Sequence, residues 1–141
     1  MGVTIESKNY SMDMGYGGFA NLRKKVAELA GKEIGKHYGK LDKGMFLYGE
    51  ERAEFFKVYN KKIGELETRF KIPRGILMFL YASDCEGKIT SSKCKHIYEV
   101  IKNYDDDILY GYCGRGYCAK FKDFKVIVKD CIDNKYNMKW F

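Results

Sequence analysis

The sequence predicts an α+β fold: a mainly helical single domain over residues 1–141, with a small antiparallel sheet that can pair the two termini. Three observations support this prediction. Apolar residues recur at helical spacing in several segments, strand-like segments stand near both ends, and the chain has one proline and no low-complexity linker. A length of 141 residues suits one domain, because two cores would leave too few residues for either.

The predicted sheet rests on the two ends of the chain. Val3-Thr4-Ile5 alternates weakly, as a short strand does, and Met138-Lys139-Trp140-Phe141 is expected to pair with it. No clear strand is expected directly before Gly15-Tyr16-Gly17-Gly18. This glycine-rich segment is itself predicted to form a flexible loop.

Helices are predicted where apolar residues are spaced three and four apart. The first opens at Phe19, and its continuation toward Tyr38 is weakened by glycines at positions 31, 35 and 39. The fourth is capped by Ser91 or Ser92 and ends near Asn103. The apolar stripes are interpreted as packing surfaces. The second, third and fifth helices are expected over about Glu50–Phe70, Pro73–Tyr81 and Ala119–Asp133.

The chain is basic and rich in aromatic residues. It carries 26 Lys and Arg against 19 Asp and Glu, a formal net charge of +7. With 45% hydrophobic and 16% aromatic residues it can bury enough surface to fold, which excludes a disordered protein. The excess positive charge favours anionic partners, namely nucleic acid, nucleotides or acidic proteins. The alternative is a solvated basic surface that serves solubility alone.

Hydropathy and cysteine content predict a cytoplasmic protein. The longest apolar run, Ile76–Ala82, is far shorter than the ~20 residues needed to cross a bilayer, so no membrane partner is expected. No leader-like segment opens the chain. Five cysteines are an odd number, typical of free thiols rather than a disulfide framework. Cys113 and Cys118 are spaced unlike zinc ligands, so no metal or other cofactor is expected.

The segment Gly15-Tyr16-Gly17-Gly18 is the first candidate binding element. Glycines let backbone N–H groups approach a ligand, and the start of a helix adds partial positive charge. Arg23 follows within two turns and can neutralise a phosphate or carboxylate. The pattern matches neither the P-loop nor the dinucleotide fingerprint, and the alternative is a tight loop whose glycines serve packing.

The second candidate is Tyr110-Gly111-Tyr112-Cys113-Gly114-Arg115-Gly116-Tyr117-Cys118. Its tyrosine faces can stack on a base, and Arg115 can hold a phosphate with two hydrogen bonds. Lys120 follows in the first turn of the next helix. The alternative is an ordered loop whose tyrosines cover the core.

Three segments resemble small accessory proteins of phages and prophages that have no assigned reaction. They are Met14-Gly15-Tyr16-Gly17-Gly18-Phe19, Leu47-Tyr48-Gly49-Glu50-Glu51-Arg52 and Ser83-Asp84-Cys85-Glu86-Gly87. The resemblance spans most of the chain and brings no active-site residues with it. It implies a context, since many small phage proteins oppose host defence by binding a protein or by sequestering a nucleotide signal.

The leading hypothesis is a non-enzymatic phage-type protein that sequesters an anionic, nucleotide-like ligand and so counters host defence. A second hypothesis is a basic interaction protein that blocks a host defence protein or nucleic acid. A third is a small phosphoester-cleaving enzyme that uses His37 or His96 as a general base. A homo-oligomer is compatible with each. The ligand-binding residues under the first hypothesis are Gly15, Tyr16, Gly17, Gly18, Arg23, Tyr112, Arg115, Tyr117 and Lys120.

Overall fold

The computed structural model describes residues 2–109 and 119–141, and it confirms the α+β fold. Helices dominate, and four short strands form one antiparallel sheet. The elements are β1 (Val3–Glu6), β2 (Ser11–Met14), α1 (Tyr16–Ala30), α2 (Lys32–Gly39), α3 (Leu41–Met45), α4 (Gly49–Phe70), α5 (Arg74–Tyr81), β3 (Gly87–Ile89), α6 (Ser91–Ile101), α7 (Phe121–Asp133) and β4 (Met138–Trp140).

The sheet joins the two ends of the chain, as the sequence predicts. Its strand order is β2-β1-β4-β3, and every neighbouring pair is antiparallel. Ile5 lies opposite Trp140, and Thr4 and Phe141 exchange two backbone hydrogen bonds of 2.9 and 3.0 Å. Because β4 sits between β1 and β3, the last residues of the chain are held on both sides.

The core lies between the sheet and the helices that pack on it. Helices α1, α5 and α7 contact the strands, and α6 packs against α5 and α7. Aromatic rings fill the centre, with Phe79 in edge-to-face contact with Phe19 and stacked on Phe124. The largest fully buried side chains are those of Trp140, Phe19, Phe79, Phe121 and Phe124.

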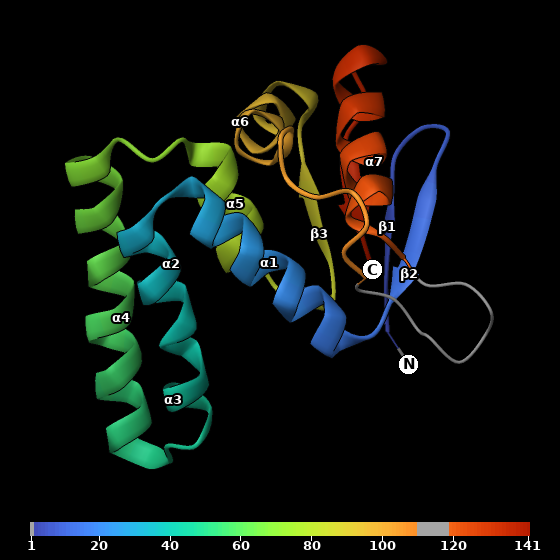
Figure 1. The fold of residues 1–141 in the computed structure, drawn as a ribbon. Helices are drawn as coiled ribbons and strands as arrows, with labels where there is room; N and C mark the ends of the chain where they lie inside the picture. Colours follow the sequence, from blue (N-terminus) through green and yellow to red (C-terminus); the bar gives the residue numbers. More distant parts are fainter. Residues whose placement is uncertain (1, 110–118) are drawn as a thin grey trace.

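Helices α2, α3 and α4 form a unit at one side of the molecule. Figure 1 shows this unit opposite the sheet, with α1 reaching between the two. Gly44 lets α3 approach α4 closely, because a Cβ at this position would lie 2.6 Å from the Phe55 ring. Although α4 spans 22 residues, only Tyr59 and Leu66 are buried in it. Most of its surface is therefore exposed.

Asp130 of α7 fastens the turn between β1 and β2. Its carboxylate accepts hydrogen bonds from the Ser7 hydroxyl at 2.7 Å, the Asn9 backbone N–H at 2.9 Å and the Asn134 amide at 2.7 Å. Burial by itself raises the pKa of this carboxyl, but the hydrogen bonds from Asn9 and Ser7 outweigh it, and the pKa lies below its ordinary value. The side chain is therefore ionised at neutral pH.

Several sequence-based expectations about local structure are wrong. Tyr16, Gly17 and Gly18 do not form a loop: they are the first residues of α1, and Gly15 is its N-cap. A strand does precede them, because β2 ends at Met14. The glycines at 31, 35 and 39 do not simply weaken one helix, since the chain turns at Gly31 and starts α2. The N-cap of α6 is Thr90, one residue before the two serines predicted.

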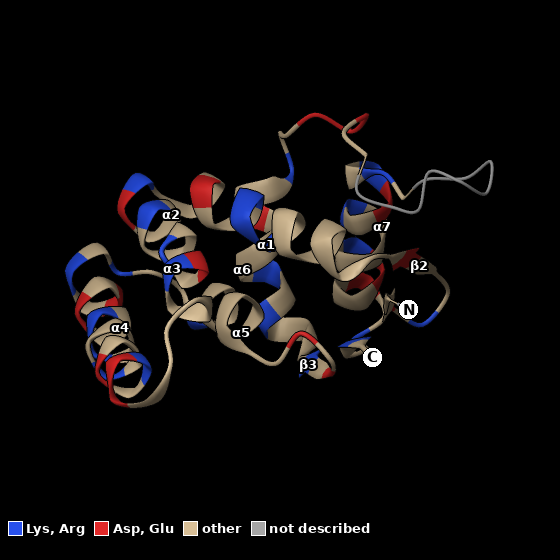
Figure 2. Cartoon of the chain, turned by 90° about the horizontal axis from the view of Figure 1, so that it is seen from below, with Lys and Arg blue, Asp and Glu red and all other residues tan. Residues whose placement is uncertain are grey.

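Charged residues of both signs are distributed over the helices. Figure 2 shows blue and red segments together along α4 and α7. Within residues 2–109 and 119–141, no helix combines the length and apolar character that crossing a membrane requires.

Candidate functional site

One face of α1 lines a cleft that the sequence did not single out. Tyr16, Phe19, Ala20, Arg23 and Lys24 recur at spacings of three and four, so they share this face. The cleft has a volume of about 420 Å³. That lies within the range of about 300–1,000 Å³ found for small-molecule sites. The facing walls come from α2 to α5 and the segment after α5, and include Tyr38, Leu41, Phe56, Tyr59 and Tyr81.

Arg23 is the main charged group in the cleft wall. It is only 5% exposed, and its guanidinium carbon lies 4.5 Å from the centre of the Phe19 ring. Its Nη2 donates to the backbone carbonyls of Ala82 at 2.8 Å and Ser83 at 3.2 Å. Two carbonyl oxygens fix the position of the group but do not cancel its charge.

No carboxylate among the described residues forms a salt bridge with Arg23, and its buried Nε lacks a hydrogen-bond partner there. Burial lowers the pKa of Arg23, while the Tyr38 phenol and the more distant Asp84 act in the opposite direction. An arginine stays protonated at neutral pH even so. A buried cation without an acidic partner is costly, which makes this guanidinium a natural receptor for an anion.

Three tyrosines from three helices form the opposite wall. Tyr38, Tyr59 and Tyr81 lie with ring centres about 6 Å apart, at 5.9 Å for Tyr38 and Tyr81 and 6.0 Å for Tyr59 and Tyr81. The Tyr59 hydroxyl is buried near that of Tyr81 but makes no hydrogen bond of good geometry to a described residue. Burial raises the pKa of Tyr59 far above its ordinary value and that of Tyr81 to about 12. Burial also raises the pKa of Tyr38, so all three phenols are neutral, and those of Tyr38 and Tyr59 can donate a hydrogen bond to a ligand.

His37 stands behind this wall and orients it. Its Nε2 lies 3.0 Å from the carbonyl oxygen of Tyr59, and its Nδ1 lies 2.8 Å from the Tyr81 hydroxyl. A carbonyl can only accept, so Nε2 carries the proton and Nδ1 accepts from Tyr81 when the ring is neutral. The imidazole also stacks on the Tyr59 ring at 3.9 Å. His37 thus holds two of the tyrosines in place, a role of positioning rather than surface charge.

Burial is the largest influence on His37 and lowers its pKa below the ordinary value. We therefore expect the free energy of unfolding to fall as the pH drops from about 7 to about 5, because the unfolded chain takes up a proton that the folded chain resists. The slope reaches at most about 1.4 kcal/mol per pH unit. Urea titrations across this range measure it. The variant His37→Gln should show a flatter slope, and an identical slope in both proteins would contradict the assignment.

The mouth of the cleft carries polar groups of both signs. Lys24, Asp42, Asn60 and Asp84 line it. The acidic groups can accept hydrogen bonds from ring N–H groups or hydroxyls of a ligand, while Lys24 attracts an anion. The arrangement combines a cation in the wall, aromatic sides and polar groups at the entrance. This composition is typical of sites for small polar aromatic molecules.

The sequence-predicted residues fall into three places. Tyr16 and Arg23 line the cleft together. Gly15, Gly17 and Gly18 lie at the N-terminus of α1 and do not line it; a Cβ at Gly17 would meet no atom within 4 Å. Lys120 is exposed at the N-cap of α7, where its backbone N–H donates to Asp123. Tyr112, Arg115 and Tyr117 lie outside the described residues.

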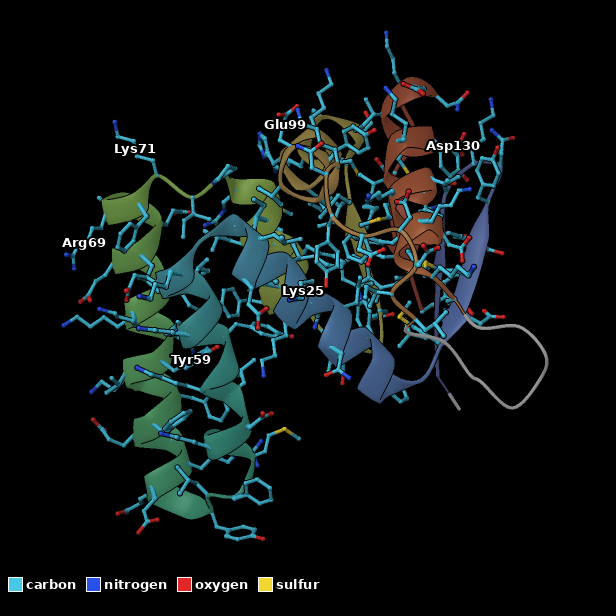
Figure 3. The ribbon with its side chains drawn as sticks, in the orientation of Figure 1. Lys25, Tyr59, Arg69, Lys71, Glu99 and Asp130 are labelled. Atoms are coloured by element: carbon cyan, nitrogen blue, oxygen red, sulfur yellow. The ribbon has the colours of Figure 1, made fainter. Side chains whose placement is uncertain are left out.

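Sequence reasoning missed the three tyrosines of the cleft. The helical spacing of Tyr59 within α4 predicts a packing residue, and Tyr38 and Tyr81 stand at the ends of predicted helical segments. Figure 3 shows Tyr59 on α4, beside α2 and away from the sheet. Only the unusual number of tyrosines, 12 in the chain, hinted at an aromatic site.

The histidines and cysteines give no sign of a metal centre in the described ranges. No group of three or more His, Cys, Asp or Glu side chains gathers there. Cys94 and Cys131 are buried free thiols, and Cys85 is an exposed one. His96 accepts a hydrogen bond from the Gly75 backbone N–H at 3.1 Å, a structural contact between α5 and α6. Cys113 and Cys118 lie outside the described residues.

The chain was also compared with protein-family models, curated proteins and solved structures, and none of them matches it. The geometry of the cleft is therefore the basis for assigning a function.

Proposed function

We propose that the protein is a non-catalytic binding protein that holds a small, anionic, nucleotide-like molecule in the cleft between α1 and α2–α5. The single observation that carries this proposal is Arg23: a buried guanidinium in the cleft wall, held by two backbone carbonyls and without a salt bridge to any described carboxylate. A phosphate or carboxylate of the ligand would supply the missing negative charge through charge-assisted hydrogen bonds.

The aromatic walls favour a ligand that carries a ring. Flat faces of Tyr38, Tyr59 and Phe56 line the cleft, and stacking on an aromatic side chain contributes about 1–3 kcal/mol per base. Neutral phenols donate hydrogen bonds to ring or phosphate oxygens. The volume of about 420 Å³ suits a mononucleotide better than a longer chain. In a phage-type protein, such binding would remove a nucleotide signal from solution and so counter host defence.

Binding is favoured over cleavage because neither His37 nor His96 is free to act as a general base in the described part of the chain. Both ring nitrogens of His37 are used in contacts to Tyr59 and Tyr81. The lowered pKa of His37 keeps the imidazole neutral, as suits a structural role. His96 is tied to the Gly75 backbone. The mixed charge pattern of the helices also disfavours a long nucleic acid, which needs a continuous basic surface.

The proposal is tested by native mass spectrometry of the protein purified from expressing cells, followed by calorimetry with adenosine and guanosine mono- and diphosphates. We expect a retained small molecule that is released intact on denaturation, or one of the four nucleotides to bind with a dissociation constant below about 1 mM. Release of a cleaved product would point to the enzyme instead. Salt-sensitive binding to long nucleic acid alone would point to the interaction protein. The proposal would be overturned if the purified protein retained no small molecule and bound none of the four nucleotides.

A further inference from the structure

The exposed side of α4 carries an apolar groove that is separate from the cleft. The groove has a volume of about 790 Å³. Leu47, Phe55 and Val58 form its apolar surface, and His37 and Tyr59 separate it from the interior. Val58, which lines the groove, is 61% exposed. An exposed valine within a larger apolar surface is typical of an interface that a partner covers.

Exposed apolar side chains also stand at both ends of α4. Tyr48, directly before the helix, is 83% exposed, and Phe70, its last residue, is 45% exposed.

The charges along this face change sign along the helix. Glu50, Glu51 and Glu54 line the groove toward the N-terminus of α4, and Lys62 lines it toward the C-terminus. Among the described residues, the salt bridge that Lys62 forms is with the exposed Glu65, at 3.7 Å, and such a contact contributes little to stability. A partner helix that fits the groove must therefore present a cation at one end and an anion at the other.

The same face of a second α4 meets that requirement. Glu51, Phe55, Val58 and Lys62 are spaced four, three and four apart, so they form one stripe. A two-fold axis placed midway between residues 56 and 57 sets Phe55 of one copy opposite Val58 of the other. The same axis sets Glu51 opposite Lys62. Each contact occurs twice, as an isologous interface requires.

We propose that the chain forms a homodimer through antiparallel pairing of this α4 stripe, defined as Glu51, Phe55, Val58 and Lys62. The antiparallel arrangement also brings Phe70 of one copy to the end of the pair where Tyr48 of the other lies. This inference does not depend on the ligand in the cleft, because the dimer uses the opposite side of Tyr59.

The test is sedimentation velocity of the full chain across micromolar concentrations. We expect a concentration-dependent dimer, and Val58→Glu should raise its dissociation constant about tenfold or more by placing two carboxylates in the apolar centre. Val58 is exposed, so this variant should fold normally. Lys61→Glu is the matched control for Lys62→Glu, because it makes the same charge change at a neighbouring exposed position off the groove.

Charge reversal gives the sharper result. Glu51→Lys alone and Lys62→Glu alone each set like charges opposite each other twice, so each variant should be monomeric at concentrations where the native chain is dimeric. Mixing the two variants restores opposite charges at both ends, so a heterodimer should form. A native chain that is monomeric at every concentration would overturn the proposal and would indicate that a different protein binds the groove. Single variants that dimerise alone as well as they do in the mixture would also overturn it.

Discussion

Replacing Arg23 with methionine is expected to weaken nucleotide binding about ten- to a hundredfold. A hydrogen bond to a charged group contributes about 1.5–3 kcal/mol, which corresponds to that loss of affinity. Methionine keeps an unbranched side chain against Phe19 but has no charge and no donor. Arg23→Lys should recover only part of the affinity, because an ammonium cannot reproduce the planar guanidinium. Calorimetry with the nucleotide that binds the native chain most tightly measures both.

The matched control is Lys25→Met. Lys25 lies two residues further along α1, pairs with Glu28 at 2.8 Å and does not line the cleft. The Lys25→Met variant loses one positive charge from the same helix as Arg23→Met, so its affinity for the nucleotide should stay within about threefold of the native value. Equal losses in the two variants would show a general charge effect and remove Arg23 from the site.

Stability must be followed on the same preparations. Arg23→Met also frees the Ala82 carbonyl, which should lower the free energy of unfolding by about 1–2 kcal/mol. The Ser83 carbonyl keeps the Trp140 indole N–H as a donor at 2.9 Å. A variant that melts earlier yet binds the nucleotide normally would show that Arg23 is structural only.

The fold class could be predicted from the sequence because its signals are local. The apolar spacing of Phe55, Tyr59, Ile63, Leu66 and Phe70 indicates a helix wherever that segment lies, and α4 spans Gly49–Phe70. Strand β2 escaped prediction because Ser11–Met14 contains no β-branched residue and only four positions. Met12 and Met14 of this strand are buried because β2 pairs with β1, and this pairing is a tertiary contact that the local sequence does not encode.

The cleft could be predicted only in small part, for a related reason. The sequence names Tyr16 and Arg23 as candidate binding residues but predicts a loop at Tyr16; only the start of α1 at Tyr16 sets both on one helix. Tyr38, Tyr59 and Tyr81 come from three different helices, and only the packing of α2, α4 and α5 brings them together. A tyrosine that lines a cleft and one that fills a core follow the same helical spacing. The absence of a salt bridge between Arg23 and any carboxylate of residues 2–109 and 119–141 is likewise a property of the fold.

The largest loss of stability is expected for Trp140→Ala, at about 3–5 kcal/mol. Trp140 is fully buried in β4 between β1 and β3, and its ring packs on Phe19 at 5.9 Å and Phe79 at 5.7 Å. Gly87 of β3 leaves room for the Trp140 ring, because a Cβ at this position would clash with it. Alanine would leave a cavity that these rigid neighbours cannot fill.

Phe141→Ala is the matched control for this prediction. The Phe141 side chain is 56% exposed, and its backbone hydrogen bonds to Thr4 survive the substitution, so the change should be less than about 0.5 kcal/mol. Urea unfolding followed by far-ultraviolet circular dichroism suits both variants, because Trp140 is the only tryptophan of the chain and its fluorescence is lost with it. Trp140→Ala should also weaken nucleotide binding, since its ring lies 5.6 Å from the Arg23 guanidinium and its indole shares the Ser83 carbonyl with it. Equal stability of the two variants would contradict the role of the C-terminal strand as the centre of the sheet.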